Sequence, residues 1–264
     1  MSDSPTPRPR RVLITGACGD IGSALANAFA ETSSPAKLAL CDLVPPPDAE
    51  AKFEPLHQRG VTVFYRQADV TDPAAVARFL DESADALGGI DVCIGNAGIV
   101  ERGQLIDLSA DAWRRTLDVN LTGCFLIAQA AARAMKRTNT RDGHILLMSS
   151  WVQDVPRENI GAYCASKSGL KMLAKCLALE LGRDNIRVNL IAPGFVDAGL
   201  TGQNLKQNPH RRGEMESSIP LGRLISADEL ARAVRHFCDE DAAYVTGATL
   251  LLDGGASVFH RKQP

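Results

Sequence analysis

The chain has 264 residues, of which 45% are hydrophobic and 23% charged, a composition typical of a soluble globular protein with a large core. Its formal net charge of −2 and its pI of about 6.2 disfavour nucleic acid and anionic membranes as partners. No stretch approaches the roughly 18 consecutive apolar residues of a membrane span, so no membrane association is expected.

The chain begins with a polar, proline-rich segment, residues 1–10 (MSDSPTPRPR), which predicts a disordered arm. It is not expected to be a signal peptide, because no apolar segment of signal type follows it. Arg11–Thr15 predicts a buried strand, and the turn TGACGDIG and a helical pattern, SALANAFAE, come next. Because glycine has no side chain, the backbone N–H groups of such a turn can approach a pyrophosphate closely, and the helix N-terminus adds partial positive charge. A dinucleotide is therefore expected at Gly16, Asp20, Ile21 and Gly22.

A second strand, Lys37–Cys41, ends at Asp42, which stands 20 residues past Gly22. An acidic side chain there can accept hydrogen bonds from both ribose hydroxyls of an adenosine and would repel a 2′-phosphate. No Arg or Lys lies within the glycine turn or directly after Asp42. The sequence therefore predicts NAD over NADP, with Asp42 and Leu43 at the adenosine. The alternative is that Asp42 merely begins a turn.

The remaining strands and helices alternate without a break. This alternation predicts a single-domain α/β fold of the Rossmann type, a doubly wound parallel sheet of about seven strands with helices on both faces. Ligands bind such sheets outside the carboxyl ends of the strands. The expected elements are a helix over 48–59, strand Val61–Arg66, helix Pro73–Leu87, strand Ile90–Ile94, a long helical pattern over Trp113–Met135, strand His144–Met148, a helix over 161–182, strand Ile186–Ile191, a polar loop-rich stretch over 195–222, helix Ala227–Cys238 and strand Thr249–Leu252.

Three residues around the fifth strand form a candidate proton-handling site. Ser150 stands 13 residues before Tyr163, and Lys167 stands four after it. Four residues make one helical turn, so Tyr163 and Lys167 share a face. An ammonium beside a phenol favours the phenolate, and Lys167 is therefore expected to lower the pKa of Tyr163 towards neutrality. Ser149 is the alternative to Ser150 as the working serine.

Taken together, these motifs resemble the short-chain dehydrogenase/reductase family in its compact single-domain branch. The resemblance runs from about Arg11 to Gly255 and rests on TGACGDIG, DVTD, NAG, the Asn of NLTG, Ser150, YCASK, PG and YVTGATLLLDGG. It implies hydride transfer between NAD and a secondary alcohol, a substrate lid over about 195–222, and a homotetramer or homodimer. The implied roles are Tyr163 as general acid/base, Lys167 lowering its pKa and holding the nicotinamide ribose, Ser150 on the substrate oxygen, Asn120 holding a water of a proton relay, Asp69 and Val70 at the adenine, Asn96, Ala97 and Gly98 along the cofactor floor, and Pro193, Gly194 and Val196 beside the nicotinamide.

Two positions depart from the family pattern. Asp20 stands where the short branch usually has a glycine, and its side chain is expected to cap the following helix or to point to solvent. Ala198 stands where the family often has a threonine, which removes one expected cofactor contact. Two assigned residues also have structural alternatives: Asn120 could cap or bend its helix, and Asp69 could form a turn before Pro73.

Substrate identity rests on the segment after Ser150. Trp151 and Val152 are expected to line the substrate pocket, and Gln153 and Asp154 to lie near its mouth, where they would suit a sugar, a polyol or another polar hydroxy compound. Lys206, His210, Arg211 and Arg212 could attract an anionic substrate, although a solvated helix face is the preferred interpretation. The alternative functions are an NADPH-dependent reductase of 3-oxoacyl groups on an acyl carrier protein and, more remotely, an NAD-sensing regulator without turnover.

Cysteine and histidine spacing completes the expectations. The seven cysteines form no CxxC pair, and the five histidines lie far apart, so free thiols in a cytoplasmic protein and no metal site are predicted. Residues 257–264 are expected to form a polar tail after a domain that covers 11–256.

Overall fold

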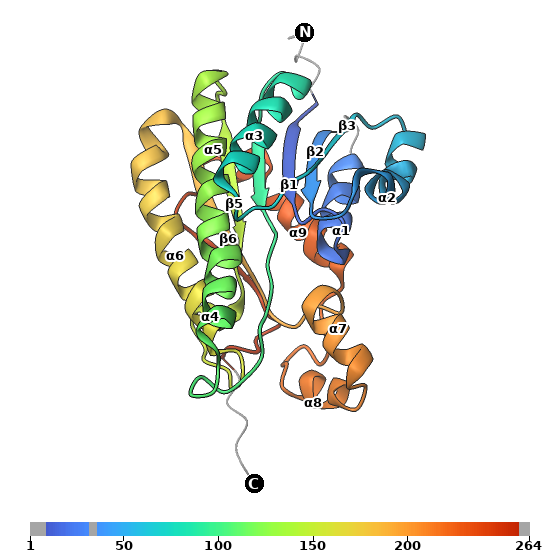
Figure 1. Ribbon diagram of the computed structural model, residues 1–264, viewed down its shortest axis with the longest axis vertical. Coiled ribbons are helices and arrows are strands. Elements are labelled where there is room, and N and C mark those ends of the chain that lie inside the picture. Colours follow the sequence, from blue (N-terminus) through green and yellow to red (C-terminus); the bar gives the residue numbers. More distant parts are fainter. Residues whose placement is uncertain (1–8, 32–35, 259–264) are drawn as a thin grey trace.

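The computed structural model describes residues 9–31 and 36–258. Within these residues one parallel seven-stranded sheet runs in the order β3-β2-β1-β4-β5-β6-β7 (Figure 1), which confirms the predicted fold class. The order reverses between β1 and β4, the place where doubly wound sheets bind ligands. The strands are β1 (Arg11–Thr15), β2 (Lys37–Asp42), β3 (Val63–Gln67), β4 (Val92–Gly95), β5 (Gly143–Met148), β6 (Ile186–Pro193) and β7 (Thr249–Leu252).

Helices cover both faces of the sheet. One face packs against α1 (Asp20–Ala30), α2 (Pro46–Gln58) and α9 (Ala227–Phe237), and the other against α3 (Pro73–Leu87), α5 (Gly123–Arg137) and α6 (Gly161–Leu181). Figure 1 shows α7 (Gly199–Gln207) and α8 (Arg211–Ser217) standing apart from these layers, beyond the carboxyl ends of the strands. The remaining elements are α4 (Ala110–Leu117) and the short helical segments η1 (Asp118–Thr122), η2 (Trp151–Gln153), η3 (Gly182–Asp184) and η4 (Glu240–Ala242).

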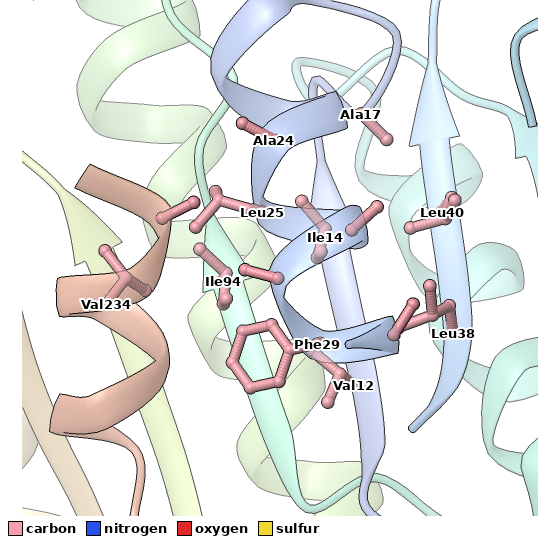
Figure 2. Close-up of a cluster of buried hydrophobic side chains, with 14 of the residues drawn as sticks. Val12, Ile14, Ala17, Ala24, Leu25, Phe29, Leu38, Leu40, Ile94 and Val234 are labelled. Carbon is pink, nitrogen blue, oxygen red and sulfur yellow. The ribbon is translucent and has the colours of Figure 1, made fainter. Parts of the chain in front are cut away.

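Alternation along each strand builds two cores. In β1, Val12 and Ile14 face the helices α1, α2 and α9, whereas Leu13 faces α3 and α5. Figure 2 shows the first core, in which Phe29 and Leu25 of α1 lie over Val12 and Ile14. Both faces of these strands are buried, so their sequences read as continuous apolar runs.

The long helical pattern over Trp113–Met135 is not one helix. It divides into α4, the π-helical segment η1 and α5, with Asn120 in the centre of η1. A π-helical segment adds a residue to one turn, and such insertions are frequent at functional sites.

The stretch 195–222, expected to be loop-rich, contains the helices α7 and α8. Their buried residues, Leu205 and Met215, join a small third core with Trp151 and Val152. Short helices are marginal by themselves, so this packing stabilises them where the sequence pattern is weak.

The predicted disordered arm over 1–10 is wrong at its inner end. The Arg10 carbonyl accepts a hydrogen bond from the Lys37 N–H at 2.8 Å, and the Arg10 guanidinium donates to the Cys238 carbonyl. Residues 1–8 of that arm and residues 259–264 of the predicted tail lie outside the described residues.

No helix of the described residues is long and apolar enough to cross a membrane.

Candidate active site

A cavity of about 970 Å³ opens at the carboxyl ends of the strands. Its wall is built from the turns that follow β1 to β6 and from one side of α7 and α8. Asn120, Gln153 and Asp154 do not line it, but the other residues assigned to the catalytic group, the cofactor or the substrate pocket do: Gly16, Asp20, Ile21, Gly22, Asp42, Leu43, Asp69, Val70, Asn96, Ala97, Gly98, Ser150, Trp151, Val152, Tyr163, Lys167, Pro193, Gly194 and Val196.

The glycine turn after β1 fits a pyrophosphate. Gly16 has φ +64°, and a Cβ on Gly22 would stand 2.7 Å from Ala17 Cα and still closer to the Gly16 carbonyl oxygen. The first backbone bond at the start of α1 runs from the Ser23 N–H to the Gly19 carbonyl at 2.8 Å. The N–H groups of the turn before it, Asp20 to Gly22, have no intrahelical acceptor and suit an anion at this wall of the cavity.

Thr15 joins this turn to the NAG stretch across the switch point. Its hydroxyl oxygen accepts from the N–H groups of Asn96 at 3.0 Å and Ala97 at 3.1 Å. The Asn96 side-chain amide donates back to the Thr15 carbonyl at 3.0 Å. The two turns that would floor a dinucleotide therefore hold each other in place. Thr15 was not predicted as a site residue. The sequence does contain a signal for it, because a polar threonine ends an otherwise apolar strand directly before the glycine turn.

Asp42 lines the cavity at the end of β2 and also stabilises the backbone around it. Its carboxylate accepts from the N–H of Cys18 at 2.9 Å and from the N–H of Leu43 at 2.7 Å. A carboxylate has about four acceptor positions, so two remain for ribose hydroxyls. The exposed side chain of Lys52, on α2, lines the same cavity. Lys52 could not be identified from the sequence, because it stands well past Asp42 along the chain. Only the fold, through α2, brings its side chain to the cavity that Asp42 also lines.

Asp69 combines its two interpretations. One carboxylate oxygen accepts from the N–H of Thr71 at 2.8 Å and from the hydroxyl of Thr71 at 2.7 Å, so Asp69 forms a turn with the residues that follow it. Asp69 also lines the cavity. Asp72 is the residue that caps α3, by accepting from the Ala74 N–H.

Asp20 does not cap α1, contrary to one of the two expectations for it. The cap position is Gly19, and the Asp20 carboxylate instead accepts from the N–H of Gly199 at 2.8 Å. This contact joins the glycine turn to the start of α7, a partner 179 positions away that local sequence could not reveal. The helix N-terminus favours the negative charge of Asp20 in this first turn.

Tyr163 and Lys167 lie together on α6, as the spacing predicts. The Lys167 Nζ stands 5.5 Å from the centroid of the Tyr163 ring and donates to the Met148 carbonyl at 2.8 Å. Burial raises the pKa of Tyr163 to about 12, against a lowering effect of its hydrogen bond with Ser150. Burial also lowers the pKa of Lys167. In the protein without a dinucleotide, burial thus raises the Tyr163 pKa, contrary to the expected shift towards neutrality.

The two serines after β5 have different partners. The Ser149 hydroxyl donates to the Gln153 side-chain oxygen at 2.7 Å and is buried. The Ser150 oxygen accepts from the Val152 N–H at 3.5 Å at the start of η2, and Ser150 also hydrogen-bonds Tyr163. Ser150 is thus the serine that faces the phenol.

Asn120 lies just outside the cavity wall. Its side chain accepts from the Ile99 N–H and donates to the Ile99 carbonyl, each at 2.8 Å, and it also donates to the Ser166 hydroxyl at 3.3 Å. It thereby holds the loop after β4 against α6. A Cβ on Gly98 would lie 3.2 Å from the Asn120 Oδ1 and 3.7 Å from the Lys167 Nζ, so both side chains approach this glycine. The role of Asn120 in a proton relay stays a prediction.

Gln153 and Asp154 are not at the pocket mouth, and that expectation is wrong. Gln153 is buried against Ser149, Asp154 pairs with Lys171 at 2.7 Å, and neither lines the cavity. The one-turn helix η2 rotates them away, while Trp151 and Val152 stay at the wall. Charged residues that do line the cavity include Arg102, Arg157, Glu158 and Arg211, and the Arg157 guanidinium lies over the Trp151 ring. Arg102 and Arg157 stand in loops without a motif, and only the tertiary structure brings them together.

Comparisons with known proteins match almost the whole chain. A family model described as Enoyl-(Acyl carrier protein) reductase matches residues 16–257. Glucose 1-dehydrogenase 2 of Bacillus subtilis is 33% identical over 95% of each chain, and cis-4-hydroxycyclohexanecarboxylate dehydrogenase of Sinomonas cyclohexanicum is 34% identical over 93% of this chain and 96% of its own. A gluconate 5-dehydrogenase of Burkholderia cenocepacia, solved in complex with NADP and tartrate, is 30% identical with a TM-score of 0.89, covering 96% of this chain and 97% of its own.

Proposed function

Since the chain belongs to the short-chain dehydrogenase/reductase family, we propose that it interconverts a polar secondary alcohol and its ketone or lactone by NAD-dependent hydride transfer. One observation carries the proposal. Ser150, Tyr163 and Lys167 line the same cavity as the glycine turn and Asp42. A proton-handling group and the residues expected to bind a dinucleotide thus share one cavity.

The chain's own residues handle the proton. A nicotinamide dinucleotide bound in this cavity supplies the hydride acceptor or donor. Tyr163 takes the proton from the substrate hydroxyl during oxidation and returns it to the carbonyl oxygen during reduction. The Ser150 hydroxyl, bonded to Tyr163, holds the same substrate oxygen. Lys167, fixed by the Met148 carbonyl, keeps a positive charge beside the phenol and favours its ionised form.

Relatives support a polar substrate. The names of two similar enzymes specify glucose and a hydroxycyclohexanecarboxylate, both of them polar hydroxy compounds. The second candidate is reduction of a 3-oxoacyl group on an acyl carrier protein with NADPH. It is favoured by the matching family, which is described as an enoyl-(acyl carrier protein) reductase family.

A dehydrogenase screen separates the two candidates. Purified protein is offered NAD or NADP with sugars, polyols, hydroxy acids and hydroxyacyl thioesters, and reduction of the dinucleotide is followed by absorbance. Turnover of a polar alcohol with NAD is the expected result. Turnover confined to thioesters with NADP would favour the second candidate, 3-oxoacyl reduction, over the first. Dinucleotide binding without turnover of any alcohol would contradict both candidates.

Asp42 is expected to decide the dinucleotide preference. Asp42→Ser removes a carboxylate that would bond the ribose hydroxyls and repel a 2′-phosphate. Hydrogen bonds to charged groups contribute about 1.5–3 kcal/mol. The ratio of kcat/KM for NAD to that for NADP should therefore fall by about 10–100-fold. Lys52→Gln, at the same end of the cavity, is expected to weaken use of NADP.

Asp48→Ser is the matched control for Asp42→Ser. Asp48 is an exposed acidic residue in the first turn of α2 and does not line the cavity. In the Asp48→Ser variant, the ratio of kcat/KM for NAD to that for NADP should stay at the wild-type value. An unchanged ratio in Asp42→Ser would remove the basis for the NAD preference.

A homotetramer, or at least a homodimer, is proposed from the exposed apolar side chains of α5 and α6. Leu179 is 83% exposed, Met172 60% and Phe125 37%. An isolated chain rarely leaves several large apolar side chains of adjacent helices in water. Light scattering is expected to give a multiple of the 28.2 kDa chain mass. Leu179→Glu should lower that mass, and a monomeric wild-type protein would refute the proposal.

A further inference from the structure

Three arginines from separate segments meet at the substrate end of the cavity. Arg102 follows β4, Arg157 lies between η2 and α6, and Arg211 is the first residue of α8. All three line the same cavity as Ser150 and Tyr163. The loops that carry the first two are joined next to these residues by a hydrogen bond from the Gly103 N–H to the Asn159 carbonyl at 3.0 Å.

Arg157 is positioned by two aromatic rings. Trp151 and Phe195 meet edge to face, with centroids 5.2 Å apart. The Arg157 guanidinium carbon lies 5.5 Å from the centroid of the first ring and 5.3 Å from that of the second. Because a cation over a ring interacts through its face, the N–H groups at the edge of the guanidinium stay available. Trp151 directly follows Ser150, so this guanidinium is held near the serine.

The arginine cluster, Arg102, Arg157 and Arg211, is not neutralised within the described residues. No ion pair within 4 Å joins any of the three to a carboxylate in the described ranges. Arg211 bonds only a neutral acceptor there, the Asn204 side-chain oxygen at 3.4 Å, and Glu158 acts on Arg157 only as a minor, longer-range charge.

The neighbouring lid arginine behaves differently. Arg212 pairs with Asp197 at 2.6 Å and with Glu216 at 3.6 Å, and it does not line the cavity. Burial lowers the pKa of Arg102 and of Arg157, and the charge of Arg211 lowers each of them further. Like charges gathered at a cavity wall without an ion-pair partner favour an anion between them.

We propose that the substrate is an anionic secondary alcohol, whose carboxylate or phosphate group is bound by Arg102, Arg157 and Arg211 while its hydroxyl lies at Ser150 and Tyr163. The proposal rests on the proposed function and names its substrate class. The planar fork of a guanidinium matches the oxygens of either group. Since Arg211 belongs to the lid and the other two to the body, the anion would also hold the lid to the body of the protein.

The test compares charged substrates with neutral partners of the same shape. Secondary hydroxy acids, including cis-4-hydroxycyclohexanecarboxylate, are each paired with their primary amides, and sugar phosphates are paired with the free sugars. For the wild type, the anionic member should have the higher kcat/KM. The ratio of kcat/KM for the anionic member to that for its neutral partner is compared between the hydroxy acids and the sugar phosphates. The larger ratio identifies whether the site prefers a carboxylate or a phosphate.

Three variants, R102Q, R157Q and R211Q, remove the charges one at a time. Each should lower the anion-to-neutral ratio of kcat/KM by about 10–100-fold, as expected for loss of a charged hydrogen bond. R157K should retain part of the ratio. R212Q is the matched control on the same helix and should keep the wild-type ratio. Circular dichroism and melting temperature check that each variant is folded.

A binding measurement separates failure of this inference from failure of the proposed function. Calorimetry on the NADH-saturated protein uses succinate and inorganic phosphate, neither of which can be oxidised at an alcohol carbon. Anion binding that is lost in R157Q and R211Q, but kept in R212Q, supports the inference even if no alcohol is turned over. Turnover of neutral alcohols with no preference for their anionic partners would leave the proposed function standing and overturn this inference.

Discussion

Replacing Tyr163 with phenylalanine is expected to lower kcat for alcohol oxidation by about 10²–10⁴-fold, the usual contribution of a positioned acid/base. The variant keeps the ring and loses only the hydroxyl, whose partner in the site is Ser150. Dinucleotide affinity, measured by fluorescence of bound NADH, should therefore stay within a few-fold of the wild type. The combination of lost turnover with retained binding assigns the hydroxyl to the chemical step.

Tyr244→Phe is the matched control for this substitution, because Tyr244 is fully exposed and remote from the cavity. It should leave turnover unchanged. A Tyr163→Phe enzyme that retained most of its turnover would exclude Tyr163 as the acid/base.

The pH profile follows from the same residue. Burial raises the pKa of Tyr163 to about 12, so at neutral pH the phenol is protonated in the protein alone. Reduction needs the protonated form and oxidation needs the ionised form. Consequently kcat/KM for oxidation should rise with pH from neutrality upwards, while that for reduction should not rise. An oxidation profile that is flat between pH 6 and 10 would contradict this assignment.

Gly22→Ala is expected to reduce dinucleotide binding at least about tenfold and to lower the melting temperature. In an open helix the change would stabilise by about 1 kcal/mol, since alanine is the better helix former. Here the added Cβ would lie 2.7 Å from Ala17 Cα and closer still to the Gly16 carbonyl oxygen, so the backbone of the turn must move. Overpacking of this kind costs about 1–3 kcal/mol, which outweighs the gain in propensity. The displaced turn is the one whose N–H groups face the cavity.

The control is Gly213→Ala, a glycine within α8 with nothing inside 4 Å of its added Cβ. This variant should be neutral or slightly stabilised, with unchanged NADH affinity. Both substitutions add a methyl group to a helical glycine, but only at Gly22 is that space already occupied. Equal stability and affinity in both would show that Gly22 is not required for the geometry of the turn.

The strand pattern of this chain was readable because each strand is short, apolar and followed by a polar or glycine turn. Arg11–Thr15 and Thr249–Leu252 were predicted to the residue. The strand predicted over Val61–Arg66 begins later, at Val63, and ends at Gln67, because pairing with β2 decides which of its residues join the sheet. Register is a property of two strands and cannot be read from one.

The helical segments were less predictable where the regular period is broken or weak. Asn120 was expected within a long helical pattern, yet it lies in the π-helical η1, where its amide holds Ile99 and Ser166. The helices α7 and α8 depend on their contacts with Trp151 and Val152. In both regions the decisive contacts are to residues distant in the sequence.

The sequence by itself determined the sheet, the glycine turn and the spacing of Ser150, Tyr163 and Lys167, because these depend on local periodicity and on residue types at fixed offsets. Only the tertiary structure decided what surrounds them. It buried Tyr163 so that its pKa rises, gave the Asp20 carboxylate a partner at Gly199, and moved Gln153 away from the cavity. It also brought Arg102, Arg157 and Arg211 to one wall. Burial and long-range contact set the charge of a site, and neither quantity is contained in the spacing of a motif.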